Sequence, residues 1–239
     1  MSTLMVSISG IRGIVGNGLD PEVLVKFTSA YADFIAKGKV VIGRDARISG
    51  EMVSSIVTGT LIAKGLDVVD IGICPTPTVQ YTVKRLNAAG GIAISASHNP
   101  NEWNALKLLN STGQFMTPEE NKTLMQILDL QKNNFKSWNS LGKRFTNNGI
   151  KEHVKDVLSL KYIEVEKVRK RKFKVLVDCV NGAGVYVIPD LLKEFGCEVI
   201  EMNCEKTGIF PRLPEPIPEN LVETMIAVKE SKADIGVVV

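Results

Sequence analysis

The segment Ser95-Ala96-Ser97-His98-Asn99-Pro100 places a hydroxyl, an imidazole and a carboxamide next to one another. It follows the run 90–94, whose apolar and β-branched residues beside a glycine pair predict a buried strand. The Asn-Pro step predicts a turn, because proline disfavours the helical region for the residue before it. Ligands bind at the carboxyl ends of strands in open α/β sheets, so this segment is the first candidate site.

The same residues also fit a simpler interpretation. Ser, Asn and Pro are ordinary turn formers, and side chains adjacent in sequence usually diverge, so Ser97 and His98 do not form a nucleophile–base pair by proximity alone. A serine hydrolase is disfavoured, since the sequence has no Gly-x-Ser-x-Gly elbow and no credible distant His–Asp pair. A plain turn and a reactive Ser97 both remain open from spacing alone.

Two further segments carry charge at places where backbone can approach a ligand. Three glycines surround Arg12 in the segment 10–16, where a guanidinium could fork onto a phosphate; a glycine-rich hairpin with a solvated arginine is the alternative. The loop 43–50 carries Arg44, Asp45 and Arg47 at the end of a short apolar strand. Its three charges predict a loop fixed by Arg–Asp pairing.

The elements that must position these residues alternate between strand and helix. Asp20-Pro21 predicts a helix start, with Asp as N-cap and Pro at the first position, and the helix is expected to end near Gly38. Strands at 40–42, 66–72 and 90–94, separated by helices from 49 or 50 and from 75, predict right-handed crossovers in a mainly parallel sheet. The fold class is therefore α/β, with mainly parallel mixed sheets sandwiched by helices.

The second half of the chain predicts another sheet. A capping box at 117–120 starts a helix that runs to about 130, and a polar connection from 131 to 149 follows. Domains are therefore expected at 1–147, complete, and 148–239, incomplete. The second domain is expected to begin with a helix over 153–168. Later elements are a strand at 175–178, a glycine-rich turn into a helix at 185–195, a strand at 199–202 and a final strand at 233–239.

The composition is that of an ordinary globular protein, and it argues against nucleic acid and membranes as partners. The 239 residues are 44% hydrophobic and 23% charged, with a net charge of +3 that is too small to indicate nucleic acid. The basic run 167–174 favours a solvated helix end over a nucleic-acid surface. No apolar run reaches membrane-spanning length. Four cysteines without CxxC spacing predict reduced thiols and a cytoplasmic location.

The segment 95–100 closely resembles the phosphoserine loop of the α-D-phosphohexomutases, which include phosphoglucomutase, phosphomannomutase and phosphoglucosamine mutase. Ser95 stands where that family usually has Thr or a small residue. The segments 9–13, 43–50, 181–184 and 210–221 are also similar to family motifs, so the resemblance covers essentially the whole chain. It implies a mutase that interconverts hexose 1-phosphate and 6-phosphate through a phosphoserine and a hexose 1,6-bisphosphate.

The resemblance also implies a role for each candidate residue. Ser97 would carry the phosphoryl group, and Lys107, ten positions later, would transfer protons and stabilise charge. The remaining implied residues act in binding or support: His98 and Arg12 in a positive wall, Ser9 and Asn99 in substrate binding, and Arg44, Asp45 and Arg47 in holding the wall of the site.

Magnesium is the implied cofactor, bound through the phosphate on Ser97 and a set of aspartates. Hard cations prefer several carboxylate oxygens, and the sequence contains no Asp-x-Asp cluster. The resemblance places those aspartates, and the loop that selects glucose, mannose or glucosamine phosphate, beyond Val239. We therefore expect an N-terminal portion that lacks C-terminal domains of the same enzyme. The alternative is an inactive fragment or a binding module without metal and sugar sites.

Overall fold

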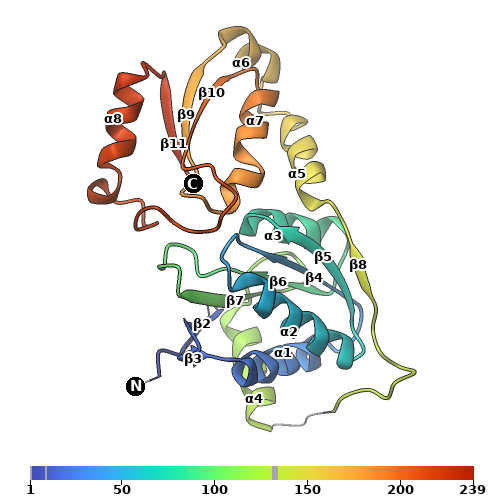
Figure 1. Ribbon diagram of the computed structural model, residues 1–239. Coiled ribbons are helices and arrows are strands. Elements are labelled where there is room, and N and C mark those ends of the chain that lie inside the picture. The colour runs from blue at the N-terminus through green and yellow to red at the C-terminus, as the bar shows by residue number, and fades with distance from the viewer. Residues whose placement is uncertain (1, 9, 131–133) are drawn as a thin grey trace. The chain divides into compact units, whose positions relative to one another are not determined.

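The computed structural model describes residues 2–8, 10–130 and 134–239 (Figure 1). The chain divides into two compact units. The first unit comprises Met1–Asp45, Ser49–Ala96 and Glu102–Gly149, and the second comprises Ala46–Ile48, Ser97–Asn101 and Ile150–Val239. The second unit thus includes two short loops, 46–48 and 97–101, although each follows a strand of the first unit in the sequence. Both loops are described with the second unit.

The first unit is built on one mixed sheet with the strand order β1-β2-β7-β6-β4-β5-β8, and β3 lies beside β2. Strands β6, β4, β5 and β8 are parallel, whereas β7, β2 and β1 continue the sheet antiparallel. The strands are β1 Met5–Ser7, β2 Gly10–Val15, β3 Gly18–Leu19, β4 Lys39–Arg44, β5 Asp67–Ile73, β6 Gly90–Ile94, β7 Trp103–Leu109 and β8 Arg144–Thr146.

Helices cover both faces of this sheet. They are α1 Pro21–Ile35, α2 Gly50–Ala63, α3 Thr76–Arg85 and α4 Pro118–Leu130. Ile92 and Ile94 of β6 and Leu106 of β7 pack with α1, α2 and α4 in the main core cluster. Gly91, which points to the opposite face, lies against Val83 of α3. The sheet is therefore a middle layer, and β6 is buried along its whole length.

Helix starts in this unit follow their sequence signals. Oδ1 of Asp20 accepts the N–H of Val23 at 2.9 Å, which confirms the predicted N-cap of α1. Thr117 Oγ1 accepts the N–H of Glu120 at 3.2 Å, and Glu120 Oε2 accepts the N–H of Thr117 at 2.8 Å, so the capping box also forms. The predicted end of α1 near Gly38 is wrong: the helix ends at Ile35, and Ala36 takes the positive φ of 63°.

The connection between the units contains more structure than its polar sequence predicts. Strand β8 extends the sheet beside β5, where Lys143 N donates to Asp67 Oδ1 at 2.9 Å. Its residues Arg-Phe-Thr are all exposed, so it pairs through its backbone and shows no apolar alternation. Residues 131–133 of the predicted connection lie outside the described residues.

The single helix predicted over 153–168 is wrong. Two helices occupy the region, α5 Gly149–Leu158 and α6 Val165–Arg171. Between them the Ser159 hydroxyl donates to the carbonyl of Asp156 at 2.8 Å. A serine hydroxyl that bonds a backbone carbonyl three residues earlier competes with continuation of the helix, and α5 ends just before this serine.

The second unit has a three-stranded parallel sheet of order β10-β9-β11. The strands are β9 Lys174–Asp178, β10 Glu198–Met202 and β11 Ile235–Val238, with the helices α7 Ile188–Glu194 and α8 Val222–Glu230 and the short 3₁₀ turns Ala183–Tyr186 and Pro218–Asn220. The helix predicted over 185–195 is thus a 3₁₀ turn followed by α7. Gly236 faces Val228 of α8, while Val237 faces the side of α7, so these helices flank opposite faces (Figure 1). The predicted α/β fold with mainly parallel sheets between helices is confirmed.

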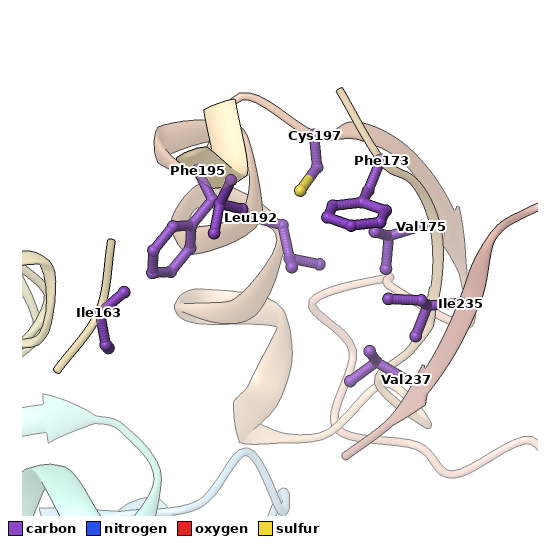
Figure 2. A pocket seen from close by; sticks show the side chains of 9 residues that line it. Ile163, Phe173, Val175, Leu192, Phe195, Cys197, Ile235 and Val237 are labelled. Atoms are coloured by element: carbon purple, nitrogen blue, oxygen red, sulfur yellow. The ribbon is translucent and has the colours of Figure 1, made fainter. Parts of the chain in front are cut away.

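An apolar pocket of about 270 Å³ lies on the α7 side of this sheet (Figure 2). Leu192 and Phe195 line it from α7, and Ile235 and Val237 line it from β11. Its walls carry carbon atoms and the one sulfur of Cys197, so they offer no charged group for a polar substrate. Separately, no helix in the described part of the chain has the length and apolar character needed to cross a bilayer.

Candidate active site

The loop 97–101 brings Ser97 and His98 to the surface directly after a buried strand. Both side chains are exposed, whereas all of β6 before them is buried. Ser97 has a φ of 56°, in the left-handed region that residues other than glycine rarely occupy. Such strain costs about 1–3 kcal/mol and is found preferentially at active sites and ligand clamps. The surrounding structure must therefore hold Ser97 in this conformation.

Arg47 is the side chain that holds this loop. It is fully buried, and its guanidinium donates to three loop carbonyls: Nη2 to Ser97 O at 2.9 Å and to Asn99 O at 2.7 Å, and Nη1 to Pro100 O. Hydrogen bonds from a charged donor are stronger than neutral ones, and the planar guanidinium fixes their directions. The loop is consequently wrapped around one cation, with the Ser97 side chain on its outside.

Asn99 offers an acceptor that the described chain does not use. Its Oδ1 is buried and accepts no hydrogen bond from the residues that the structure describes. A buried polar atom without a partner costs roughly 1–3 kcal/mol. An O–H or N–H donor on a bound ligand would satisfy it, which suits the expected role of Asn99 in substrate binding.

The loop 43–50 joins the ends of two parallel strands. Asp45 N donates to Ile94 O at 2.9 Å, and Arg44 Nη1 lies 3.5 Å from the carbonyl of Asp45. These contacts fix the place where β4 and β6 both end, from which the loops carrying Arg47 and Ser97 leave. The Arg–Asp pairing expected from the sequence stays a prediction.

Arg12 and Lys107 lie on one face of the first unit's sheet, in neighbouring strands. Arg12 pairs with Ala105 in the antiparallel β2–β7 ladder, and Lys107 is two residues further along β7. Residues two apart in a strand share a face, so the two residues are diagonal neighbours, about 7–8 Å apart, with their Cβ atoms somewhat closer. Both are partly exposed. Two cations at this spacing can contact one phosphate.

The glycine-rich segment around Arg12 is a strand as far as Val15, hairpin-paired with β1. A Cβ on Gly10, whose φ is 129°, would lie 2.3 Å from Leu106 O and 3.3 Å from the Cα of Lys107. The glycine therefore allows the close backbone approach that brings β2 against β7. Ser9, expected to bind substrate, lies outside the described residues.

The expected residues thus fall into two groups, each within one unit. Arg12, Lys107, Arg44 and Asp45 belong to the first unit. Arg47, Ser97, His98 and Asn99 form the group of the second unit.

Sequence reasoning missed two residues of the second unit: Phe210, which contacts Arg47 of this group, and Asn101, which joins the end of the Ser97 loop to Gly208. Asn101 Nδ2 donates to Gly208 O at 2.8 Å, and the Arg47 Cζ lies 4.8 Å from the centre of the Phe210 ring. The only sequence signal was the proximity of Asn101 to Pro100 and the aromatic start of the proline-rich segment 210–221.

Magnesium, which the resemblance implies, finds no complete set of ligands among the residues that the structure describes. The described residues contain no group of three or more His, Cys, Asp or Glu side chains that could hold a metal ion. Around Ser97 the carbonyls of Ser97, Asn99 and Pro100 are already bound to Arg47. The residues described here therefore do not by themselves fit the implied cation.

Comparison with known protein families gives matches over both units. Residues 4–135 match the family model "Phosphoglucomutase/phosphomannomutase, alpha/beta/alpha domain I", and residues 151–239 match "alpha/beta/alpha domain II" of the same family. A curated phosphoglucomutase/phosphomannomutase of Thermococcus kodakarensis is 38% identical over 234 residues, which are 95% of this chain and 51% of that protein. A phosphoglucosamine/phosphogalactosamine mutase of Sulfurisphaera tokodaii is 35% identical over 232 residues, 95% of this chain and 50% of that protein.

Solved structures agree with the sequence relatives. A crystal structure of a phosphomannomutase-like protein from Thermus thermophilus superposes with a TM-score of 0.86 at 26% identity, and covers 100% of this chain and 55% of that one. The chain spans about half the length of the curated relatives it matches. By the two family models and these relatives, the chain belongs to the phosphoglucomutase/phosphomannomutase family.

Proposed function

We propose that this chain is the phosphoryl-carrying part of a phosphosugar mutase, which interconverts hexose 1-phosphate and hexose 6-phosphate. Ser97 carries the phosphoryl group, and a hexose 1,6-bisphosphate is the intermediate. The observation that supports this most is the exposed hydroxyl of Ser97, held at a φ of 56° by a loop bound to the buried Arg47. A hydroxyl fixed by its backbone can face successive acceptors without losing its orientation.

The transfers use the serine ester as a temporary carrier. In the first, the P–O bond to Ser97 Oγ breaks, a P–O bond to a sugar hydroxyl oxygen forms, and the proton of that hydroxyl ends on Oγ. After the bisphosphate turns round, the reverse transfer moves its other phosphoryl group to Oγ and a proton back to the sugar. Two easier steps replace one difficult transfer.

The cations of the two groups act on the charge of the phosphates. Arg12 and Lys107 share a sheet face and bind phosphate oxygens, and Lys107 and His98 pass the proton between the sugar hydroxyl and Ser97 Oγ. Catalysis of this kind is mostly positioning and charge stabilisation. Arg44, Asp45 and Arg47 support the loops. The donor groups of the described residues do not complete a magnesium site, and no step here is assigned to magnesium.

The same proposal has three further parts. The chain forms domains at 1–147 and 148–239, it is cytoplasmic, and it works together with C-terminal domains of the same enzyme. The family models end and restart between residues 135 and 151, and the four cysteines are free thiols, as in reducing compartments. Relatives about twice as long support the need for further domains of the same enzyme.

The test is the location of the phosphate. The chain, extended by the C-terminal half of the Thermococcus kodakarensis relative, is incubated with glucose 1,6-bisphosphate and mapped by peptide mass spectrometry. We expect phosphate on Ser97, its loss in Ser97→Ala and its retention in Ser95→Ala, a matched serine two residues earlier. An extended protein that folds cooperatively and carries phosphate elsewhere, or carries none, would defeat the proposal.

A further inference from the structure

A buried carboxylate ends the central strand of the second unit. Asp178 is fully buried and accepts five hydrogen bonds. Its Oδ1 takes the N–H of Val180 at 3.0 Å and Nδ2 of Asn203 at 3.1 Å, while its Oδ2 takes Oγ1 of Thr224 at 2.6 Å and two nitrogens of Arg212. Every lone pair of the carboxylate is engaged, so Asp178 at the end of β9 is held by Val180, by Asn203 just after β10, by Arg212 and by Thr224 of α8.

Arg212 connects the fixed carboxylate of Asp178 to an irregular loop. Its Nε and Nη2 donate to Asp178 Oδ2 at 3.2 and 2.8 Å, and its side chain is 14% exposed. Its Nη1 donates to the carbonyl of Leu213 at 3.0 Å. We define residues 205–213 as the strap. At the other side of the strap, Asn181 accepts from Glu205 N at 2.8 Å and donates to Ile209 O at 3.2 Å.

The strap meets the Ser97 loop through main-chain and ring contacts. The Asn101 carboxamide donates to Gly208 O at 2.8 Å and accepts from Phe210 N at 3.2 Å, as a neighbouring strand would. Gly208 lies so close to Ala46 that a Cβ would come 1.8 Å from its carbonyl oxygen. The Phe210 ring covers the guanidinium of Arg47, 4.8 Å from Cζ to the ring centre.

The geometry points to Asp178 and Arg212 as positioning residues for Ser97. Arg212 is two residues from Phe210, and Phe210 covers the same Arg47 that holds three carbonyls of the Ser97 loop. Removing Arg212 frees one end of the strap, so the ring shifts from Arg47 and the backbone around Ser97 loses its support. The inference rests on the proposed role of Ser97.

A purely structural role for Arg212 predicts something different. If the ion pair only held the second unit together, its loss would loosen α7 and β9 as much as the Ser97 loop. A positioning role confines the effect to the strap and to residues 97–101. Local backbone order, measured residue by residue, therefore separates the two.

The experiment compares ¹⁵N-relaxation order parameters in the 239-residue chain and its variants. Arg212→Met removes the fork but leaves Asp178 three donors, Arg212→Lys keeps the charge, and Phe210→Leu removes the ring while the ion pair stays. Lys167→Met, which breaks a surface pair with Glu164 at 2.7 Å, is the matched control. We expect order parameters of about 0.85 in the wild type at 97–99 and 101, the loop residues that carry an N–H, and below about 0.6 in Arg212→Met and Phe210→Leu.

The measured residues of 188–194 in α7 should keep their order in every variant. Arg212→Lys should restore part of the order at 97–99 and 101, and Lys167→Met should match the wild type. Unchanged order at 97–101 in both Arg212→Met and Phe210→Leu, or an equal loss in α7, overturns the inference.

A second readout follows the rate at which glucose 1,6-bisphosphate phosphorylates Ser97 in the extended protein. Displacing a reacting group by about 1 Å costs up to about a hundredfold in rate, so we expect a fall of at least about tenfold in Arg212→Met. If the wild type takes no phosphate, the proposed function fails, while the order parameters still decide the positioning inference.

Discussion

The hydroxyl of Ser97 stands on a backbone conformation that serine does not prefer. A residue with a Cβ in the left-handed region is strained by about 1–2 kcal/mol, and glycine is not. The conformation therefore lowers the free energy of unfolding while it fixes the direction in which the side chain leaves the loop.

This strain leads to a prediction about stability. Ser97→Gly should raise the free energy of unfolding by about 0.5–1 kcal/mol relative to Ser97→Ala, because glycine relieves the strain at some cost in unfolded-state entropy. Both variants should lack the phosphate. Urea titration followed by circular dichroism measures the difference, and equal midpoints for the two variants would show that φ at Ser97 carries no strain.

Asp178 links the second unit's stability to pH. Its burial alone would raise the pKa, but the hydrogen bonds from Thr224, Arg212, the Val180 N–H and Asn203 outweigh burial and hold the pKa of this carboxyl below its ordinary value. A carboxyl with a lower pKa in the folded than in the unfolded state stabilises the fold above the unfolded pKa, about 3.9. That contribution is lost as the pH falls through the folded pKa.

Thr224→Val tests this linkage with an isosteric change. Losing the 2.6 Å hydrogen bond should cost about 1–2 kcal/mol at pH 7, and the cost should shrink as the pH falls and Asp178 becomes protonated. Urea unfolding at pH 7, 4 and 2 measures it. Thr123→Val, at an exposed site of α4, is the control and should show no such dependence. If the cost of Thr224→Val does not change with pH, the hydrogen bond from Thr224 does not contribute to the lowered pKa of Asp178.

At the scale of elements, the first residue of β2, Gly10, and the residue that follows the strand, Gly16, differ in what surrounds them. Gly10 has backbone of β7 within 2.3 Å of a Cβ position, whereas Gly16, with a φ of 81°, has no atom within 4 Å. Both glycines have a positive φ, so an alanine at either position is strained. Comparing the two substitutions therefore separates the cost of backbone strain from the cost of a steric clash.

Gly10→Ala should therefore destabilise the first unit by about 3 kcal/mol or more, and Gly16→Ala by only about 1 kcal/mol. The larger cost arises because β2 must move from β7, which also moves Arg12 from Lys107. Thermal unfolding of both variants provides the comparison. Similar losses for the two would mean that the β2–β7 approach is not tight.

Sequence reasoning reached those elements whose signals are local. The cap at Asp20, the capping box at Thr117 and the strand before Ser97 each depend on residues within a few positions. The positive φ of Ala36 and the existence of strand β8 were not predicted. Neither has a local signal, because tertiary packing imposes a positive φ on an alanine and a strand on residues without apolar alternation. The candidate site followed the same pattern: Ser97 was proposed from the residues of its own loop, but the contact of that loop with the strap, through Asn101, joins residues more than 100 positions apart.

At the scale of the whole molecule, the chain spans about half of its curated relatives. The described residues contain no group of three metal-binding side chains, and the proposed activity draws on phosphates with several negative charges. We expect the 239-residue chain alone to interconvert glucose 1-phosphate and 6-phosphate at a rate indistinguishable from buffer. A coupled dehydrogenase assay measures it, with the extended protein as positive control. Clear turnover by the chain alone would contradict this expectation.

The binding of Arg47 to the Ser97 loop has an electrostatic consequence. In a planar trans peptide the carbonyl and the following N–H point in opposite directions. Because the carbonyls of Ser97 and Pro100 turn towards the guanidinium, the N–H groups of His98 and Asn101 turn away from it. The buried cation thus orients a layer of peptide dipoles, and an anion on the outer side of the loop meets their positive ends.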